Sequence, residues 1–251
     1  MAGSKNKLRS QKLLPNLEAM AAAREVDEQE EGGEASDTTH LAVLSQQPID
    51  FAPDSSKIPR LKRFRFQLLH QWLIQNFAPC KAADIGGGKG LLGYLLAKSG
   101  WQVTVIDPVQ QPLPDKYRDI LSGQRIKIDP RDQVACLPAE FEIEMAAGFD
   151  LLLAMHAHGC NARIIDAAAR YGCAFVIFPC CVIGEPFYPR LGVHWLESLA
   201  DYALYRGCAI RPFRLNFKGQ NIGLCGRAAK PAAGLNSFTP AWAVESAVRN
   251  L

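Results

Sequence analysis

Short apolar runs alternate with segments of helical periodicity through the middle of the chain. Four runs rich in apolar residues predict strands that are buried on both faces: 82–85, 102–106, 150–155 and 173–178. Between them, residues 90–99 and 161–170 have apolar residues at helical spacing, and Gly100 and Gly172 follow as the expected stops. Strands that alternate with helices predict an α/β fold with a doubly wound, Rossmann-like, mostly parallel sheet.

The flanking segments complete a seven-stranded sheet. A helix is expected over 61–77, because apolar residues recur there at helical spacing, and Pro79 follows it. Residues 125–128 are expected to form a third strand and 141–147 a short helix. An amphipathic helix is expected from Trp195 to Tyr205. Two final runs, 211–217 and 222–227, enclose a Lys-Gly-Gln-Asn turn and predict a hairpin that adds an antiparallel edge.

Charge and composition divide the chain into three parts. Residues 1–56 carry five Lys/Arg and ten Asp/Glu, a net charge of −5, and outside a weak helical patch at 13–24 they have the composition of a disordered extension. Residues 57–230 are expected to form the folded domain, and 231–251 a tail. The chain after residue 56 carries 23 basic and 15 acidic residues, a net charge of +8, which is compatible with an anionic partner such as RNA.

Several classes of protein are not expected. No run of 18 apolar residues exists, so we expect no membrane span and no membrane partner. The first residues lack the apolar segment of a secretory signal, and the eight cysteines form no CxxC pair. Buried, reduced thiols in a cytoplasmic protein are therefore the expectation. No obligate protein partner is evident from the sequence.

The most informative segment reads Asp84-Ile85-Gly86-Gly87-Gly88-Lys89-Gly90, between an expected strand and an expected helix. Glycines in such a turn let the backbone bend sharply and approach a ligand closely. Asp107 ends the next strand, where a carboxylate accepts hydrogen bonds from ribose hydroxyls. A nucleotide-like ligand is predicted, and a nicotinamide or flavin cofactor remains an alternative.

The two-residue spacing of Gly86, Gly88 and Gly90 behind an acid resembles motif I of class I S-adenosylmethionine (SAM)-dependent methyltransferases. The resemblance implies SAM as cofactor. It implies that Asp84 organises the loop and approaches the methionine amino group, that Gly86 and Gly88 pass under the methionine moiety, and that Asp107 holds the ribose. Such enzymes have a seven-stranded sheet whose last strand runs antiparallel.

Two later loops carry the candidate catalytic residues. His156-Ala157-His158-Gly159-Cys160 follows the strand at 150–155, and Pro179-Cys180-Cys181 follows the strand at 173–178. These segments resemble the His-Ala-Cys-Gly and Pro-Cys-Cys segments of a methyltransferase subfamily that includes the tRNA acceptor-stem 2′-O-methyltransferase. His158 stands where that group usually has cysteine, and Cys160 where an acid is common.

The chemistry of these loops leaves three readings open. His156 or His158 could remove a proton from the acceptor, since imidazole titrates near neutral pH. Cys180 or Cys181 could act as a covalent nucleophile, although the Asp-x-Pro-Cys segment of cytosine-C5 methyltransferases is missing. The same histidines and cysteines could hold a metal, but their spacing matches no zinc-finger or zinc-ribbon pattern, so no metal is expected.

A basic segment at 57–66 supplies candidate nucleic-acid contacts, and four of its residues are expected to meet phosphates: Arg60, Lys62, Arg63 and Arg65. Phe64 and Phe66 could stack on bases or pack into the core. The leading hypothesis is a SAM-dependent methyltransferase that acts on RNA, with tRNA favoured. A small-molecule methyltransferase and a non-catalytic SAM-binding or scaffold protein are the alternatives.

Overall fold

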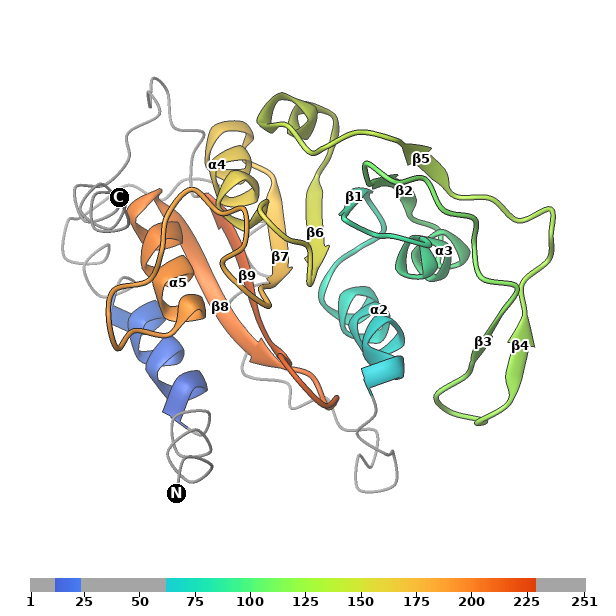
Figure 1. Cartoon of the computed structure of the whole chain (residues 1–251), viewed down its shortest axis with the longest axis horizontal. Coiled ribbons are helices and arrows are strands. Elements are labelled where there is room, and N and C mark those ends of the chain that lie inside the picture. The colour runs from blue at the N-terminus through green and yellow to red at the C-terminus, as the bar shows by residue number, and fades with distance from the viewer. Residues whose placement is uncertain (1–11, 24–61, 229–251) are drawn as a thin grey trace. The chain divides into compact units, whose positions relative to one another are not determined.

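The computed structural model describes residues 12–23 and 62–228 (Figure 1). Seven strands form a mostly parallel sheet in the order β5-β2-β1-β6-β7-β9-β8, and a separate pair, β3 and β4, forms a two-stranded sheet. Only β9 runs antiparallel to its neighbours, β7 and β8. This arrangement confirms the predicted Rossmann-like α/β class. The antiparallel strand lies inside the sheet, and β8 occupies the edge.

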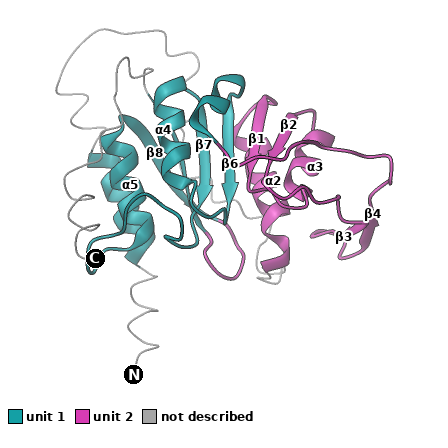
Figure 2. Ribbon diagram, turned by 45° about the horizontal axis from the view of Figure 1, so that its top comes forward, with its two compact units in different colours: residues 1–32, 142–214, 222–251 teal, residues 33–141, 215–221 magenta. Residues whose placement is uncertain are grey.

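The chain divides into two compact units, which Figure 2 colours separately. Unit 2 comprises residues 33–141 and 215–221. Its strands in the main sheet are β1 (Lys81–Ile85), β2 (Gln102–Ile106) and β5 (Ala135–Leu137), all parallel. Its helices are η3 (Lys62–Phe64), α2 (Arg65–Asn76) and α3 (Leu91–Lys98). Helices α2 and α3 pack against each other, and α3 packs on β2.

The predicted third strand at 125–128 is wrong as a member of the main sheet. It forms β4 (Arg125–Lys127), which pairs antiparallel with β3 (Lys116–Arg118). The local turn between them explains the pairing, because Asp119 accepts hydrogen bonds from the backbone of Leu121 and Ser122. The strand beside β2, at the edge of the main sheet, is β5 instead, and the apolar pattern did not predict it.

The β3–β4 hairpin is fixed to the rest of unit 2 on two sides. Buried Gln67 of α2 donates to the Arg118 carbonyl at 2.8 Å and accepts from the Ile120 N–H at 2.8 Å. Tyr117 and Ile128 belong to an apolar cluster with Tyr94 and other residues of α3. The hairpin is therefore an ordered part of this unit.

Unit 1 comprises residues 1–32, 142–214 and 222–251. Its strands are β6 (Leu151–Met155), β7 (Ala174–Phe178), β8 (Cys208–Arg214) and β9 (Ile222–Ala228), and its helices are η4 (Ile143–Gly148), α4 (Asn161–Tyr171) and α5 (Trp195–Tyr205). Strands β6 and β7 are buried at every position, as their continuous apolar sequence predicts. Gly172 ends α4 in the left-handed conformation, with φ 69°.

Three polar interactions join the helices of unit 1. Asp166 of α4 accepts a hydrogen bond from the Tyr202 hydroxyl at 2.7 Å and pairs with Arg206 at 2.9 Å. Residues 12–23 form a helix whose Leu17 is fully buried, and Asn16 donates to Glu197 of α5 at 3.0 Å. This helix matches the weak helical patch predicted at 13–24. The other residues of 1–56 and the tail from 231 lie outside the described residues.

None of the helices in the described ranges is long and apolar enough to cross a membrane.

Candidate functional site

The glycine loop between β1 and α3 has the conformation that its sequence predicts. Gly86, Gly88 and Gly90 adopt positive φ angles of 64°, 55° and 70°, which side chains rarely allow. Gly87 is required for a different reason, because a Cβ there would lie 2.6 Å from Asp84 Oδ2. The loop thus presents bare backbone to its surroundings, and each of its glycines has a physical reason.

Asp107 holds this loop in place from the end of β2. Its Oδ2 accepts the Gly88 N–H at 2.9 Å, and its Oδ1 accepts the Val109 N–H at 2.9 Å. Each carboxylate oxygen has a further lone pair, so ribose hydroxyls could still donate to a half-buried Asp107.

Asp84 is a buried carboxyl directly beneath the loop. Its side chain is 2% exposed, and its Oδ2 has no hydrogen-bond partner among the described residues. Burial raises the pKa of Asp84 to about 7, and the negative charge of Asp107 contributes to the rise, while a hydrogen bond from the Gly93 backbone opposes it. A buried acid in this state favours a nearby positive charge.

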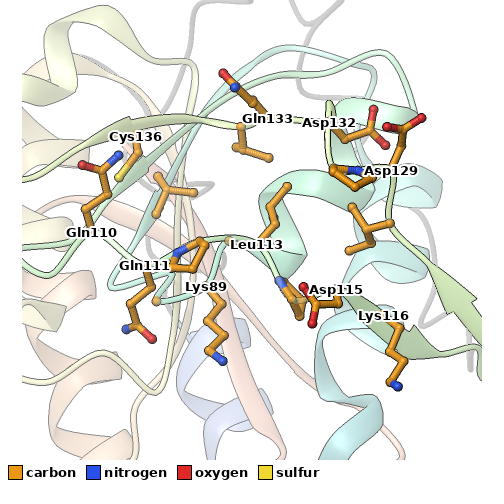
Figure 3. Close-up of a pocket in the computed structure, with 18 of the residues that line it drawn as sticks. Lys89, Gln110, Gln111, Leu113, Asp115, Lys116, Asp129, Asp132, Gln133 and Cys136 are labelled. Atoms are coloured by element: carbon orange, nitrogen blue, oxygen red, sulfur yellow. The ribbon is translucent and has the colours of Figure 1, made fainter.

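A pocket of about 890 Å³ begins at the same loop (Figure 3). Its lining includes the glycine-loop residues Gly88 to Gly90 and the hairpin residues Lys116 and Lys127. Apolar and amide side chains also line it, together with three carboxylates: Val105, Gln110, Gln111, Leu113, Ile128, Gln133, Val134, Asp115, Asp129 and Asp132. The volume is within the range of small-molecule sites.

A second group of candidate residues lies in unit 1, in the loops that follow β6 and β7. His158 Nδ1 is 3.2 Å from Cys181 Sγ, and His158 Nε2 is 3.6 Å from Cys180 Sγ. The two sulfur atoms are 3.8 Å apart. Three of the four predicted catalytic residues therefore meet in one cluster, which we call the thiol–imidazole cluster (His158, Cys180 and Cys181).

His156 shapes the first of these loops through its backbone. It is the only non-glycine residue in the described ranges with a positive φ, at 61°, a conformation that costs about 1–3 kcal/mol. Its N–H donates to the Phe178 carbonyl at 3.0 Å, and the Cys180 thiol lies 3.8 Å from its carbonyl oxygen. The strain is held by contacts between the two loops.

Glu185, which the sequence analysis did not single out, ties the second loop to the start of α4. This carboxylate is 7% exposed and accepts from the Asn161 N–H at 3.0 Å, the Asn161 side-chain amide at 2.6 Å and the Ala162 N–H at 3.1 Å. Gly159 and Gly184 touch through their backbones, since a Cβ on Gly159 would lie 3.0 Å from the Gly184 oxygen. In the sequence, only Gly159 and Gly184 could have indicated that these two loops are in close contact.

Cys160 belongs to the structural core and not to the cluster. It is 7% exposed, and burial raises the pKa of its thiol to about 12, with the Glu185 charge adding to the rise. All eight cysteines of the chain are free, and Cys173, Cys208 and Cys225 are buried like Cys160.

The predicted phosphate contacts differ in exposure. Lys62 and Arg63 are exposed, whereas the Arg65 guanidinium lies 4.2 Å from the centre of the Phe66 ring, and burial lowers its pKa. Phe64 is 5% exposed and so packs into the core. Arg60 lies outside the described residues.

A second basic surface was missed by the sequence analysis. In the β3–β4 hairpin Lys116 is opposite Lys127, and Arg118 is opposite Arg125. Directly opposed residues and those two apart share one face of a strand pair, so the four cations lie on one face. We call this face the basic hairpin face. Its sequence signal is the basic–apolar–basic alternation on both sides of Ser122-Gly123.

Comparison with known proteins gives structural similarity only. No family model matches the chain, and no curated protein matches it. Among solved structures, ribosomal protein L11 methylase from Lactobacillus delbrueckii subsp. bulgaricus is 14% identical with a TM-score of 0.40, and the match covers 66% of this chain and 77% of that one.

Two further structures are similar at the same level. CalO1, a methyltransferase of calicheamicin biosynthesis in its SAH-bound form, is 11% identical with a TM-score of 0.37, over 66% of this chain and 53% of that one. An O-methyltransferase family protein from Burkholderia thailandensis is 15% identical with a TM-score of 0.40, over 66% and 55%. This chain therefore spans little more than half the length of these two proteins.

Proposed function

We propose that the chain is a SAM-dependent methyltransferase. The observation that carries the proposal is the glycine loop, in which three left-handed glycines lie over a buried Asp84 whose Oδ2 has no partner in the described structure. SAM carries a positive sulfonium and an ammonium group, and both suit a carboxyl group that burial holds near its titration point.

The residues of unit 2 fit such a ligand part by part. The backbone of Gly86 and Gly88 would pass under the methionine moiety, and Asp107 would accept hydrogen bonds from the ribose hydroxyls. The apolar and amide side chains of the adjoining pocket would accommodate the adenine. Bound SAM supplies an activated methyl group, so the protein has only to align the acceptor and accept its proton.

The loops after β6 and β7 are proposed as the acceptor side of the reaction. His156 or His158 would accept the proton of a hydroxyl or protonated nitrogen, and Cys180 and Cys181 would line the site. Their resemblance to the loops of the tRNA acceptor-stem 2′-O-methyltransferase group supports an RNA acceptor.

The basic hairpin face favours RNA over a small molecule as the substrate. Like charges placed directly opposite each other destabilise a hairpin, and phosphates bound across them would relieve the repulsion. Lys116 and Lys127 also line the pocket that begins at the glycine loop, beside Asp115, Asp129 and Asp132, so the basic hairpin face borders this pocket. The basic hairpin face and the exposed residues Lys62 and Arg63 are the candidate contacts for the phosphate backbone of tRNA.

The test is to incubate the purified chain with methyl-labelled SAM and, separately, with total RNA, a protein extract and a metabolite fraction. We expect label in RNA, concentrated in tRNA. Label in the metabolite fraction alone would establish the small-molecule alternative. SAM binding without transfer to any fraction would establish the non-catalytic alternative.

A further inference from the structure

We propose that the thiol–imidazole cluster binds a thiophilic divalent cation of the zinc type through His158, Cys180 and Cys181. Their ligand atoms all lie within 4.8 Å of one another, and no other such group of three is found among the described residues. The spacing along the sequence gave no expectation of a metal here. The inference rests on geometry in unit 1 alone and does not depend on the methyltransferase proposal.

The distance between the two sulfurs and one sulfur–nitrogen distance match those of a tetrahedral zinc ion. Zinc–sulfur bonds of about 2.3 Å and zinc–nitrogen bonds of about 2.0–2.1 Å place two bound sulfurs about 3.8 Å apart and a sulfur and nitrogen about 3.6 Å apart. The Cys180 and Cys181 sulfurs are 3.8 Å apart, and His158 Nε2 is 3.6 Å from Cys180 Sγ. The imidazole faces Cys181 with its other nitrogen, because His158 Nδ1 is 3.2 Å from Cys181 Sγ. A zinc ion binds one imidazole nitrogen, so the exposed His158 ring has to turn until a single nitrogen faces both sulfurs.

The donor set determines the kind of metal. Two thiolates and an imidazole are the ligands that zinc prefers, and soft thiolates disfavour magnesium and calcium. Three protein ligands leave one coordination position open, which is the pattern of zinc sites that bind water or a substrate oxygen. His158 is exposed and the two cysteines are half-buried, so a cation can reach the cluster from solvent.

The loops hold the three ligands in place without the metal. The hydrogen bond from the His156 N–H to the Phe178 carbonyl joins the two loops just before the cluster residues. Glu185 and the Gly159–Gly184 contact join them just after these residues. Ligands fixed in this way need little ordering on binding, which favours affinity. If His158 is a metal ligand, His156 is the remaining candidate for the acceptor's base.

The experiment is a Zn²⁺ titration of the full, chelator-free chain in a non-thiol reductant, in competition with a chromophoric chelator. We expect saturation at one equivalent with a Kd below about 1 µM. Cys181→Ser and His158→Ala should each weaken binding by at least about 100-fold. Cys80→Ser removes another half-buried thiol and should leave the titration unchanged.

Cobalt provides a second readout that reports the ligands themselves. Co²⁺ added to the wild-type chain should give a thiolate-to-metal charge-transfer band that is lost in a Cys180→Ser/Cys181→Ser variant. His158→Ala changes an exposed side chain and keeps the test valid if the double variant does not fold. The proposal is overturned if the wild-type chain shows no saturable binding, if His158→Ala binds as tightly as wild type, or if Cys80→Ser weakens binding equally.

Discussion

The loop after β1 and the loops after β6 and β7 differ in what they offer a ligand. The glycine loop offers a ligand its backbone atoms, and the carboxyl group of Asp84, only 2% exposed, lies beneath it. The other two loops present thiol and imidazole groups that solvent reaches. The first arrangement suits an organic cation with hydroxyl groups, and the second suits a soft metal ion. A mutation in the glycine loop should therefore weaken SAM binding and leave Zn²⁺ binding unchanged, and a mutation at the thiol–imidazole cluster should do the reverse.

The largest effect is expected from Gly87→Ala. The new Cβ would lie 2.6 Å from Asp84 Oδ2, so the loop has to shift away from the geometry that we propose for SAM. SAM affinity should fall by at least about 100-fold by calorimetry, with Zn²⁺ affinity unchanged. Gly148→Ala is the matched control, because a Cβ there meets nothing within 4 Å. Equal SAM binding by the two variants would contradict the proposed role of the loop.

Glu185→Ala should have the next largest effect and the opposite selectivity. It leaves buried N–H groups of Asn161 and Ala162 without their acceptor, at a cost of about 2–4 kcal/mol in the free energy of unfolding. Urea unfolding measures this cost, and Zn²⁺ titration should show weaker binding because the loop clamp is lost. Unchanged stability would mean that Glu185 does not hold the loops.

Asp84 should make SAM binding depend on pH. Because the pKa of Asp84 in the ligand-free chain is about 7, its ionised fraction rises through neutral pH, and a cationic ligand prefers the ionised form. Affinity should be about tenfold weaker at pH 6 than at pH 8. Asp84→Asn should bind SAM weakly at both values, and a pH-independent affinity in the wild-type chain would rule out this coupling.

The same carboxyl group should lower stability as pH rises. The folded pKa of Asp84 is above its unfolded value, so the folded chain binds the extra proton between about pH 4 and 7. The free energy of unfolding should fall across that window, by up to about 4 kcal/mol, and level off above it. Asp84→Asn should lack this slope and melt at a higher temperature than wild type at pH 8.

The sequence predicted elements with continuous apolar runs to within a residue or two, as for β1, β2, β6, β7 and α4. It missed β5, because three residues with exposed ends carry too little pattern. It placed 125–128 in the main sheet, because the alternation of polar and apolar residues predicts a strand but not the strand with which it pairs. It named the glycine loop at 84–90 as the proposed cofactor site, because these residues are contiguous in the sequence. It also named His158, Cys180 and Cys181, but it could not predict their contacts, because residues 22 and 23 apart meet only through the turn at His156 and the glycine contact.

The smallest effect on stability is expected from Lys116→Gln/Lys127→Gln. Removing one opposed cation pair should leave stability unchanged or raise it by a few tenths of a kcal/mol. Bulk tRNA binding should weaken, and the slope of log affinity against log salt should become shallower by about 2. Arg131→Gln is the control, since Arg131 is exposed but already paired with Asp129 at 2.7 Å. An equal loss in the control would remove the case for the basic hairpin face.

The central claim is that the glycine loop of unit 2 binds SAM, and calorimetric titration of the wild-type chain with SAM and with NAD⁺ tests it most directly. We expect saturable binding of one SAM per chain and no heat with NAD⁺. Binding of NAD⁺ in place of SAM, or of neither, would contradict the assignment of the loop between Asp84 and Gly90.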